Sequence, residues 1–132
     1  MKQYQFRFAY FTQRYDETAA FYRDGLGFGL VGGWDRGPEN RGALFQAAAG
    51  IIEVMAQPVA GKEGLWDARP PQGAMMLIEV EDVAKLYAEV QTRGLTITHE
   101  LQDQSWGHTS FCVEEPNGLT VYLFSATAKL WR

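Results

Sequence analysis

The sequence has little cysteine, little histidine and no long hydrophobic run. Cys112 is the single cysteine among 132 residues, so no disulfide can form within the chain. A lone thiol is typical of a reducing compartment, and we expect a cytoplasmic protein. No stretch approaches the roughly 18 apolar residues of a membrane-spanning helix. The first ten residues, MKQYQFRFAY, lack the apolar core of a secretion signal. We therefore expect no membrane segment and no membrane partner.

An excess of basic charge is also missing. Lys and Arg number 12 against 16 Asp and Glu, which gives a formal net charge of -4. Nucleic acids and anionic surfaces attract basic proteins, so neither is expected as a partner. The mild acidic balance is compatible with a cationic or neutral small molecule. His99 and His108 are too few for a histidine-rich metal cluster.

The two halves of the sequence repeat the same order of expected secondary-structure elements. Each half shows a strand, a helix and three further strands, a repetition that favours two similar modules. Asp16 and Asp82 precede the two helical patterns, where an Asp side chain can accept a hydrogen bond from a free backbone N–H. The second helix carries apolar residues at helical spacing on one face. The expected strands are 4–11, 28–34, 42–48, 50–56, 74–80, 95–101, 107–114 and 119–125.

Composition divides the chain between the two repeats. Residues 58–72 hold three prolines and two glycines and are typical of a linker, although they contain Trp66. We expect one domain, 1–132, with module one at 1–57, this linker, module two at 73–126 and a tail at 127–132. Trp131 in the tail is expected at the surface or at a dimer contact.

Three segments carry a family resemblance. They are YDETAAFYRDGLGF (15–28), VEDVAKLYAEVQTRGL (80–95) and WGHTSFCVEEPNGLTVYLF (106–124). In this order the segments resemble the glyoxalase/bleomycin-resistance/extradiol-dioxygenase superfamily, also called vicinal oxygen chelate proteins. The resemblance implies an α+β fold of two βαβββ modules, with curled mixed sheets around a cavity and helices on the convex face. It also implies a homodimer.

The resemblance allows the family's metal positions to be tested. Metal-dependent members carry His or Glu at four strand positions, which correspond here to Arg7, Glu53, Met75 and Tyr122. Arginine cannot lose its proton to bind a cation, and a divalent ion needs three or four donors. We therefore expect no metal and no cofactor. Arg7 and Glu53, on neighbouring strands, are expected to pair as a bidentate fork. The pair either orients a ligand or only neutralises two charges.

Strand alternation and the family fold together predict which side chains face the cavity. Phe8 and Tyr10 should face the helix, which leaves Arg7 and Phe11 on the cavity side. Each tryptophan has the alternative of a plain core role, and His108 that of a strand residue without catalytic function. The expected ligand-binding residues are Arg7, Phe11, Trp34, Glu53, Trp66, Met75, Trp106, His108, Tyr122 and Phe124.

The lost ligand positions, the aromatic rim and the acidic charge favour one function. We expect a metal-free small-molecule binding protein that resembles the bleomycin-resistance branch and sequesters an antibiotic or an aromatic metabolite. The alternative is an enzyme of the same superfamily, a lyase, isomerase or dioxygenase-like protein. Such an enzyme would use His108, Glu53 and Tyr122 as acid–base groups or recruit a metal in an unforeseen way. A third possibility is an accessory or dimer module whose cavity is filled by its own side chains.

Overall fold

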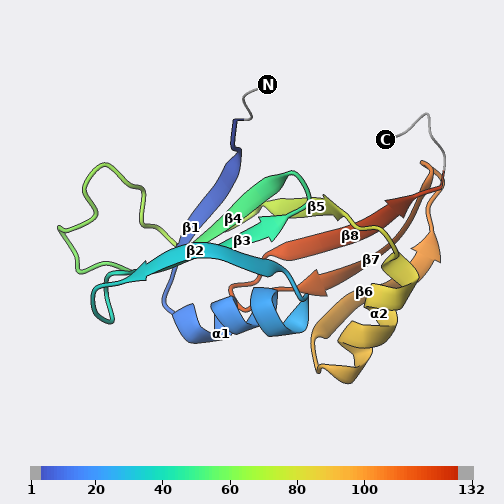
Figure 1. Ribbon diagram of the computed structural model, residues 1–132, viewed down its shortest axis with the longest axis horizontal. Coiled ribbons are helices and arrows are strands. Elements are labelled where there is room, and N and C mark those ends of the chain that lie inside the picture. The colour runs from blue at the N-terminus through green and yellow to red at the C-terminus, as the bar shows by residue number, and fades with distance from the viewer. Residues whose placement is uncertain (1–3, 128–132) are drawn as a thin grey trace. The chain divides into compact units, whose positions relative to one another are not determined.

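The computed structural model describes residues 4–127 (Figure 1). The described chain divides after Gln72 into two compact units, here called unit 1 (residues 4–72) and unit 2 (residues 73–127). Each unit holds one four-stranded sheet and one main helix. Among the described residues, neither helix is long and apolar enough to cross a bilayer. Trp131, expected at a surface or dimer contact, lies outside the described residues.

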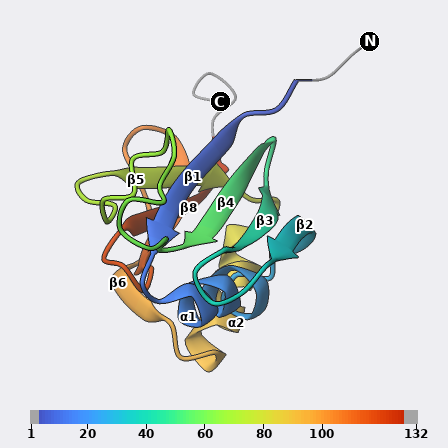
Figure 2. The same cartoon turned by 90° about the vertical axis from the view of Figure 1, so that its left-hand side faces the viewer.

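Unit 1 builds its sheet in the order β1-β4-β3-β2, and Figure 2 shows these strands side by side. β1 runs parallel to β4, and the other neighbours are antiparallel. Helix α1 (Tyr15–Ala20) follows β1 and continues into a π-helical turn, Phe21–Gly25. The strands are β1 (Arg7–Thr12), β2 (Gly29–Asp35), β3 (Arg41–Ala47) and β4 (Gly50–Ala56).

The expected capping of the first helix by Asp16 is wrong. Helix α1 begins at Tyr15, two residues earlier than a cap at Asp16 would allow, so Arg14 occupies the N-cap and offers no side-chain cap. Thr12 Oγ1 accepts a hydrogen bond from Arg14 N at 2.8 Å and holds the entry to the helix instead. Asp16 lies in the first turn, where a carboxylate is favoured by the positive end of the helix dipole. There it binds Arg41 Nη1 at 3.2 Å.

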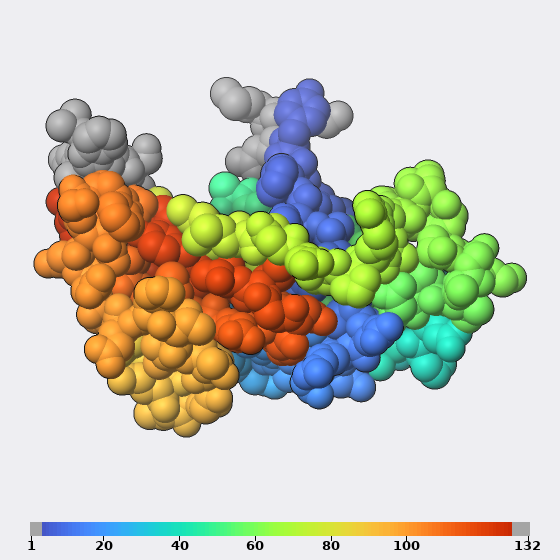
Figure 3. All heavy atoms as spheres, turned by 180° about the vertical axis from the view of Figure 1, so that it is seen from behind, coloured from blue at the N-terminus to red at the C-terminus, as the bar shows by residue number. Residues whose placement is uncertain are grey.

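Unit 2 repeats this topology with the strand order β5-β8-β7-β6, again with one parallel pair, β5 and β8. The capping of α2 (Val83–Thr92) by Asp82 is confirmed, because Asp82 Oδ1 accepts a hydrogen bond from Lys85 N at 3.1 Å. Figure 3 shows the outer side of this helix (gold) at the surface. The strands are β5 (Met75–Glu79), β6 (Thr96–Asp103), β7 (His108–Glu114) and β8 (Thr120–Ala126).

In each unit the helix covers one face of the sheet with aromatic contacts. Tyr22 packs on Phe45 of β3 with ring centroids 5.7 Å apart, and Tyr87 packs on Phe111 of β7 at 5.1 Å. The Tyr10 hydroxyl meets that of Tyr22 at 2.8 Å, which confirms that Tyr10 faces the helix. The α+β class with two βαβββ modules is therefore confirmed, with strand ends shifted by at most three residues.

Candidate functional site

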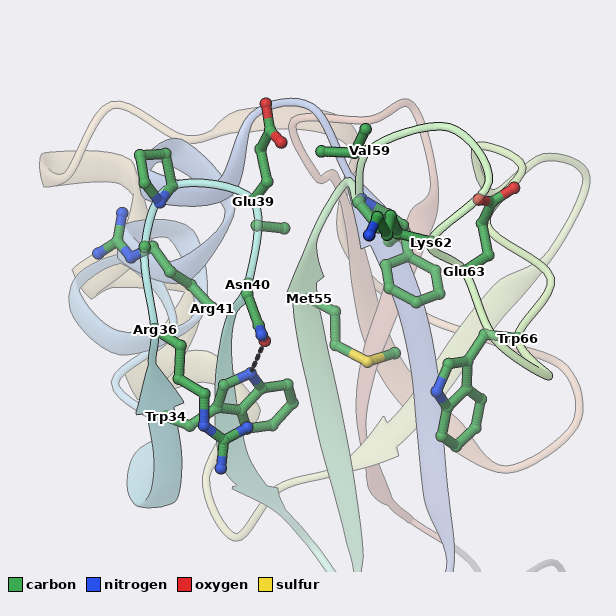
Figure 4. A pocket seen from close by; sticks show the side chains of 15 residues that line it. Trp34, Arg36, Glu39, Asn40, Arg41, Met55, Val59, Lys62, Glu63 and Trp66 are labelled. Atoms are coloured by element: carbon green, nitrogen blue, oxygen red, sulfur yellow. Dashed lines mark hydrogen bonds between the residues drawn. The ribbon is translucent and has the colours of Figure 1, made fainter.

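A pocket of about 560 Å³ opens on unit 1 (Figure 4). Its lining brings together three of the residues expected from the sequence, Phe11, Trp34 and Trp66, and all the other lining residues also belong to unit 1. The pocket lies within the common size range of small-molecule sites, roughly 300–1,000 Å³. Unit 1 alone therefore supplies a candidate ligand site.

The floor of the pocket is apolar and comes from the two parallel strands. Phe11 of β1 stands opposite Met55 of β4 in the strand register. Both side chains are buried, at 7% and 5% exposure. Residues directly opposite on neighbouring strands share a face of the sheet, so Phe11 and Met55 form one continuous apolar surface. The expected orientation of Phe11 agrees with this placement.

The walls are the two tryptophans. Trp34 comes from the end of β2 and Trp66 from the segment between β4 and β5, and Figure 4 shows them on opposite sides with Met55 between. That segment projects from the sheet as a wide loop (Figures 1 and 3). Gln57 Nε2 donates to Ala68 O at 2.9 Å and ties the loop back to the end of β4. Trp66 is 55% exposed, so its ring is open to a ligand.

The rim carries charges of both signs. Arg36 and Lys62 stand against Glu39 and Glu63, and within residues 4–127 none of these four makes an ion pair. Arg41, which also lines the pocket, is engaged: its guanidinium contacts Asp16 at 3.2 Å and Asp35 at 3.5 Å. The unpaired rim charges balance one another, which gives the pocket little preference for a charged ligand.

The expected pair of Arg7 and Glu53 exists, but it is not a bidentate fork. Arg7 Nη1 meets Glu53 Oε1 at 3.0 Å, while Arg7 Nε donates to Gln5 Oε1. The register explains the single contact, because Glu53 stands opposite Ala9 and Arg7 stands opposite Ile51. The guanidinium must reach along the sheet and is divided between two partners. Arg7 is 43% exposed, so the pair is a partly solvated one.

A second group of expected residues gathers on the sheet of unit 2. Tyr122 Oη accepts a hydrogen bond from Trp106 Nε1 at 3.0 Å and lies 3.0 Å from His108 Nδ1. The His108 ring stacks on Phe124 with centroids 3.9 Å apart and planes 17° apart. The expected common face of Trp106, His108, Tyr122 and Phe124 therefore agrees with the contacts. These four form the unit 2 cluster.

The hydrogen bonds of the unit 2 cluster can run in sequence from Trp106 through Tyr122 to His108. The Trp106 indole N–H can only donate, so Tyr122 Oη accepts it and its own hydroxyl proton is left for His108 Nδ1. When Tyr122 Oη donates to Nδ1, the neutral His108 ring carries its proton on Nε2. A histidine oriented in this way can take part in acid–base chemistry, provided that a substrate lies within reach.

Comparison with known proteins fits this architecture. Residues 5–123 match the family model described as the Glyoxalase/Bleomycin resistance protein/Dioxygenase superfamily. The chain belongs to this superfamily. None of the curated proteins compared with the chain matches it in sequence.

Solved structures show the same fold at low sequence identity. TioX from Micromonospora sp. ML1 has a TM-score of 0.77 at 18% identity and covers 94% of this chain and 99% of its own. TnmS3, an antibiotic binding protein from Streptomyces sp. CB03234, has a TM-score of 0.69 at 17% identity over 95% and 97%. A lactoylglutathione lyase from Agrobacterium tumefaciens has a TM-score of 0.72 at 18% identity over 99% and 98%. Identities this low show the fold alone.

The metal positions of the superfamily are divided between the units here. Arg7 and Glu53 belong to unit 1, whereas Met75 and Tyr122 belong to unit 2. Met75 begins β5 and is half-exposed, and Tyr122 is engaged in the unit 2 cluster. Across residues 4–127, no three His, Cys, Asp or Glu side chains gather into a possible metal site. The guanidinium and thioether at two positions are a poor donor set for the divalent ions of this superfamily.

Cys112 and His99 lie outside the pocket of unit 1. Cys112 is buried, and burial raises the pKa of its thiol, so the reactive thiolate is disfavoured. His99 is exposed and lies in the middle of β6. Sequence reasoning missed Met55 and the polar rim. Alternation along β4 would have found Met55, which lies two residues after Glu53 and so shares its face.

Proposed function

We propose that this superfamily member binds a planar aromatic small molecule of no net charge in the unit 1 pocket and holds it without covalent change. The observation that carries the proposal is the pair of indoles, Trp34 and Trp66, on opposite sides of an apolar floor. Aromatic walls stack on flat ligands and contribute about 0.5–1.5 kcal/mol for each ring pair beyond the buried area. Such a pocket selects flat shapes.

The charges of the rim support the choice of an uncharged ligand. Arg36 and Lys62 face a similar number of carboxylates, Glu39 and Glu63. A cation or an anion entering the pocket would gain attraction from one pair and repulsion from the other. A neutral ring system avoids that conflict and avoids the cost of desolvating a charge.

The relatives fit a binding role of this kind. TnmS3 is described as an antibiotic binding protein, and its fold is shared by this chain. Under the proposal, the protein belongs to the metal-free, bleomycin-resistance-like branch and sequesters an antibiotic or an aromatic metabolite in the cytoplasm. The proposal extends to a homodimer, the assembly that the family resemblance implies.

The test measures binding of matched tricyclic probes by fluorescence polarisation. The probes are 9-methylanthracene, anthracene-9-carboxylate and 9-(aminomethyl)anthracene, which share one ring system and differ in charge. We expect the neutral probe to bind at least as tightly as the two charged ones. Trp34→Leu and Trp66→Leu should each weaken binding by about tenfold, the stacking contribution of one ring.

Leu65→Ala is the matched control, because Leu65 is 87% exposed beside Trp66 and does not line the pocket. This variant should bind like the unchanged protein. Full affinity in both tryptophan variants would overturn the proposal. A clear preference for the carboxylate or the amine would overturn the choice of an uncharged ligand.

The 3.0 Å contact between Tyr122 and His108 favours a second candidate, an enzyme that uses acid–base chemistry. Incubation with substrates of the superfamily's lyases, isomerases and dioxygenases, followed by mass spectrometry, distinguishes binding from catalysis. Recovery of every compound unchanged supports binding. Turnover that is lost in both His108→Ala and Tyr122→Phe supports the enzyme.

A further inference from the structure

The indole of Trp34 lies flat across Gly42 of the neighbouring strand. Trp34 and Gly42 stand opposite each other in the pairing of β2 with β3. A Cβ atom added at Gly42 would lie 2.2, 2.4 and 2.4 Å from three consecutive atoms of the six-membered ring. Near-equal distances to three adjacent atoms mean that the face of the ring, rather than its edge, covers Gly42. Any side chain at position 42 would displace the indole.

The indole nitrogen is held from the side. Trp34 Nε1 donates to Asn40 Oδ1 at 2.9 Å, as Figure 4 shows. The backbone of Asn40 is in turn fixed by the loop between the two strands. Its backbone carbonyl accepts a hydrogen bond from Arg36 N at 2.9 Å, and its backbone N–H donates to Gly37 O at 3.0 Å. Trp34 is therefore positioned by Gly42 against one ring face and by Asn40 at its polar edge.

This arrangement decides which way the Asn40 amide points. An indole N–H is a donor only, so the carbonyl oxygen of the amide must face it. The Nδ2 amino group is then turned away from the indole nitrogen. Asn40 is exposed and lines the pocket, and within residues 4–127 its Nδ2 makes no hydrogen bond. A hydrogen-bond donor therefore stands beside the aromatic wall.

We infer that Trp34 and Asn40, positioned by Gly42, recognise a planar aromatic compound that carries a carbonyl-type oxygen at the edge of its ring system. The ring stacks on the indole, and the oxygen accepts a hydrogen bond from Asn40 Nδ2. The inference rests on the proposed function, and it narrows the ligand class to flat rings with a peripheral oxygen acceptor. Gly42 is the residue that positions the Trp34 indole.

The first test compares two neutral tricyclic fluorescent probes, 10-methylacridone, which has a ring carbonyl, and 9-methylanthracene, which has none. The unchanged protein should bind 10-methylacridone about 3- to 10-fold more tightly, the usual contribution of one hydrogen bond. Asn40→Asp keeps an oxygen for Trp34 Nε1 and removes the amino donor. In this variant the preference for 10-methylacridone over 9-methylanthracene should disappear.

The second test displaces the indole without touching the rim. Gly42→Ala should weaken both probes by about tenfold, because the stacking surface is lost. Gly32→Ala is the matched control, since Gly32 lies on the same sheet and an added Cβ there meets nothing within 4 Å. Thermal unfolding of each variant shows whether the fold is kept, and Asn40→Asp remains informative even if Gly42→Ala does not fold.

The outcomes separate this inference from the proposed function. Equal affinity of the unchanged protein for the two probes, or a preference that survives in Asn40→Asp, overturns the recognition of a ring oxygen alone. Full affinity in a folded Gly42→Ala overturns the positioning role of Gly42. If neither probe binds, or if Trp34→Leu and Trp66→Leu bind normally, the proposed function falls and this inference falls with it.

Discussion

Unit 1 and unit 2 share a strand order, yet they use their aromatic side chains in different ways. In unit 1, Trp34 and Trp66 leave ring faces free along a pocket, and the Trp34 N–H bonds to a loop amide. In unit 2, a ring nitrogen of Trp106 and one of His108 are both hydrogen-bonded to the Tyr122 hydroxyl. The same βαβββ architecture can thus present stacking surface or satisfy its polar groups internally. The side chains, rather than the fold, decide between the two.

The connection between the last two strands of each unit shows the same contrast. In unit 1, Ala48 takes a positive φ of 51°, and the Gln46 side-chain amide bonds to Ala48 O and Gly50 O. In unit 2, the buried carboxylate of Glu115 accepts from Asn117 Nδ2 at 2.8 Å and Leu119 N at 2.9 Å. One turn is held at the surface by a neutral amide and the other from within by a charge.

The largest effect should come from removing that buried charge. Glu115 is 1% exposed, and Glu115→Ala leaves the N–H groups of the turn without their acceptor. We expect the free energy of unfolding to fall by about 3 kcal/mol, since hydrogen bonds to charged groups are worth about 1.5–3 kcal/mol each. Urea denaturation measures the loss. Glu114→Ala, at the exposed neighbouring position, should change little. Equal stability of the two variants would contradict the buried role of Glu115.

A smaller loss is expected in the unit 2 cluster. Tyr122→Phe removes the oxygen that Trp106 and His108 share. The unfolding free energy should fall by about 1–2 kcal/mol, because two partly buried nitrogens lose their protein partner. ¹⁵N NMR of His108 should show the Nε2–H tautomer in the unchanged protein, and the Nδ1 shift should change in Tyr122→Phe because its hydrogen bond is lost. Tyr87→Phe, which keeps the aromatic contact with Phe111, is the control and should remain close to the unchanged protein.

The turn of unit 1 should respond in the opposite direction. Ala48 holds a left-handed backbone conformation that costs a non-glycine residue about 1–2 kcal/mol. Ala48→Gly relieves that strain, and the greater flexibility of glycine in the unfolded chain offsets part of the gain. We expect a stabilisation of about 0.5–1 kcal/mol in thermal denaturation. Ala49→Gly has no positive φ to relieve and should destabilise slightly. A loss of stability in both variants would argue against strain at Ala48.

The partly solvated ion pair between Arg7 and Glu53 in unit 1 should matter little for stability. Arg7→Met removes the single contact with Glu53, and pairs that are this solvated contribute about 0–1 kcal/mol. The variant should unfold within about 1 kcal/mol of the unchanged protein by urea denaturation. The same variant decides the role of the pair: loss of probe binding with the fold intact shows that Arg7 orients a ligand. Unchanged binding shows that the pair is structural.

The repeated order of elements and the family resemblance predicted the fold but not the site. Alternation along β1 placed Tyr10 on the helix side and Phe11 on the opposite, pocket side, because successive side chains of a strand point to opposite faces of the sheet. The prediction that Asp16 caps α1 was wrong because the helix begins two residues earlier, and Thr12 supplies the local hydrogen bond. The contact of Trp34 with Gly42 depends on strand register and the shape of a loop, which residue spacing alone does not determine. Tryptophans near loops were the useful signal, and they led to the pocket.

The last prediction concerns the loop that carries Trp66. Hydrogen bonds from the side chain and the backbone N–H of Arg69 lower the pKa of the Asp67 carboxyl to about 2, from an ordinary value of 3.8. A lowered pKa means that the contact is fully present above pH 3.8 and is lost as the pH falls through about 2. The ¹³C shift of the Asp67 carboxyl should therefore titrate near pH 2. Arg69→Gln should return it toward its ordinary value. Titration near 3.8 in the unchanged protein would show that Asp67 and Arg69 do not hold this part of the loop in solution.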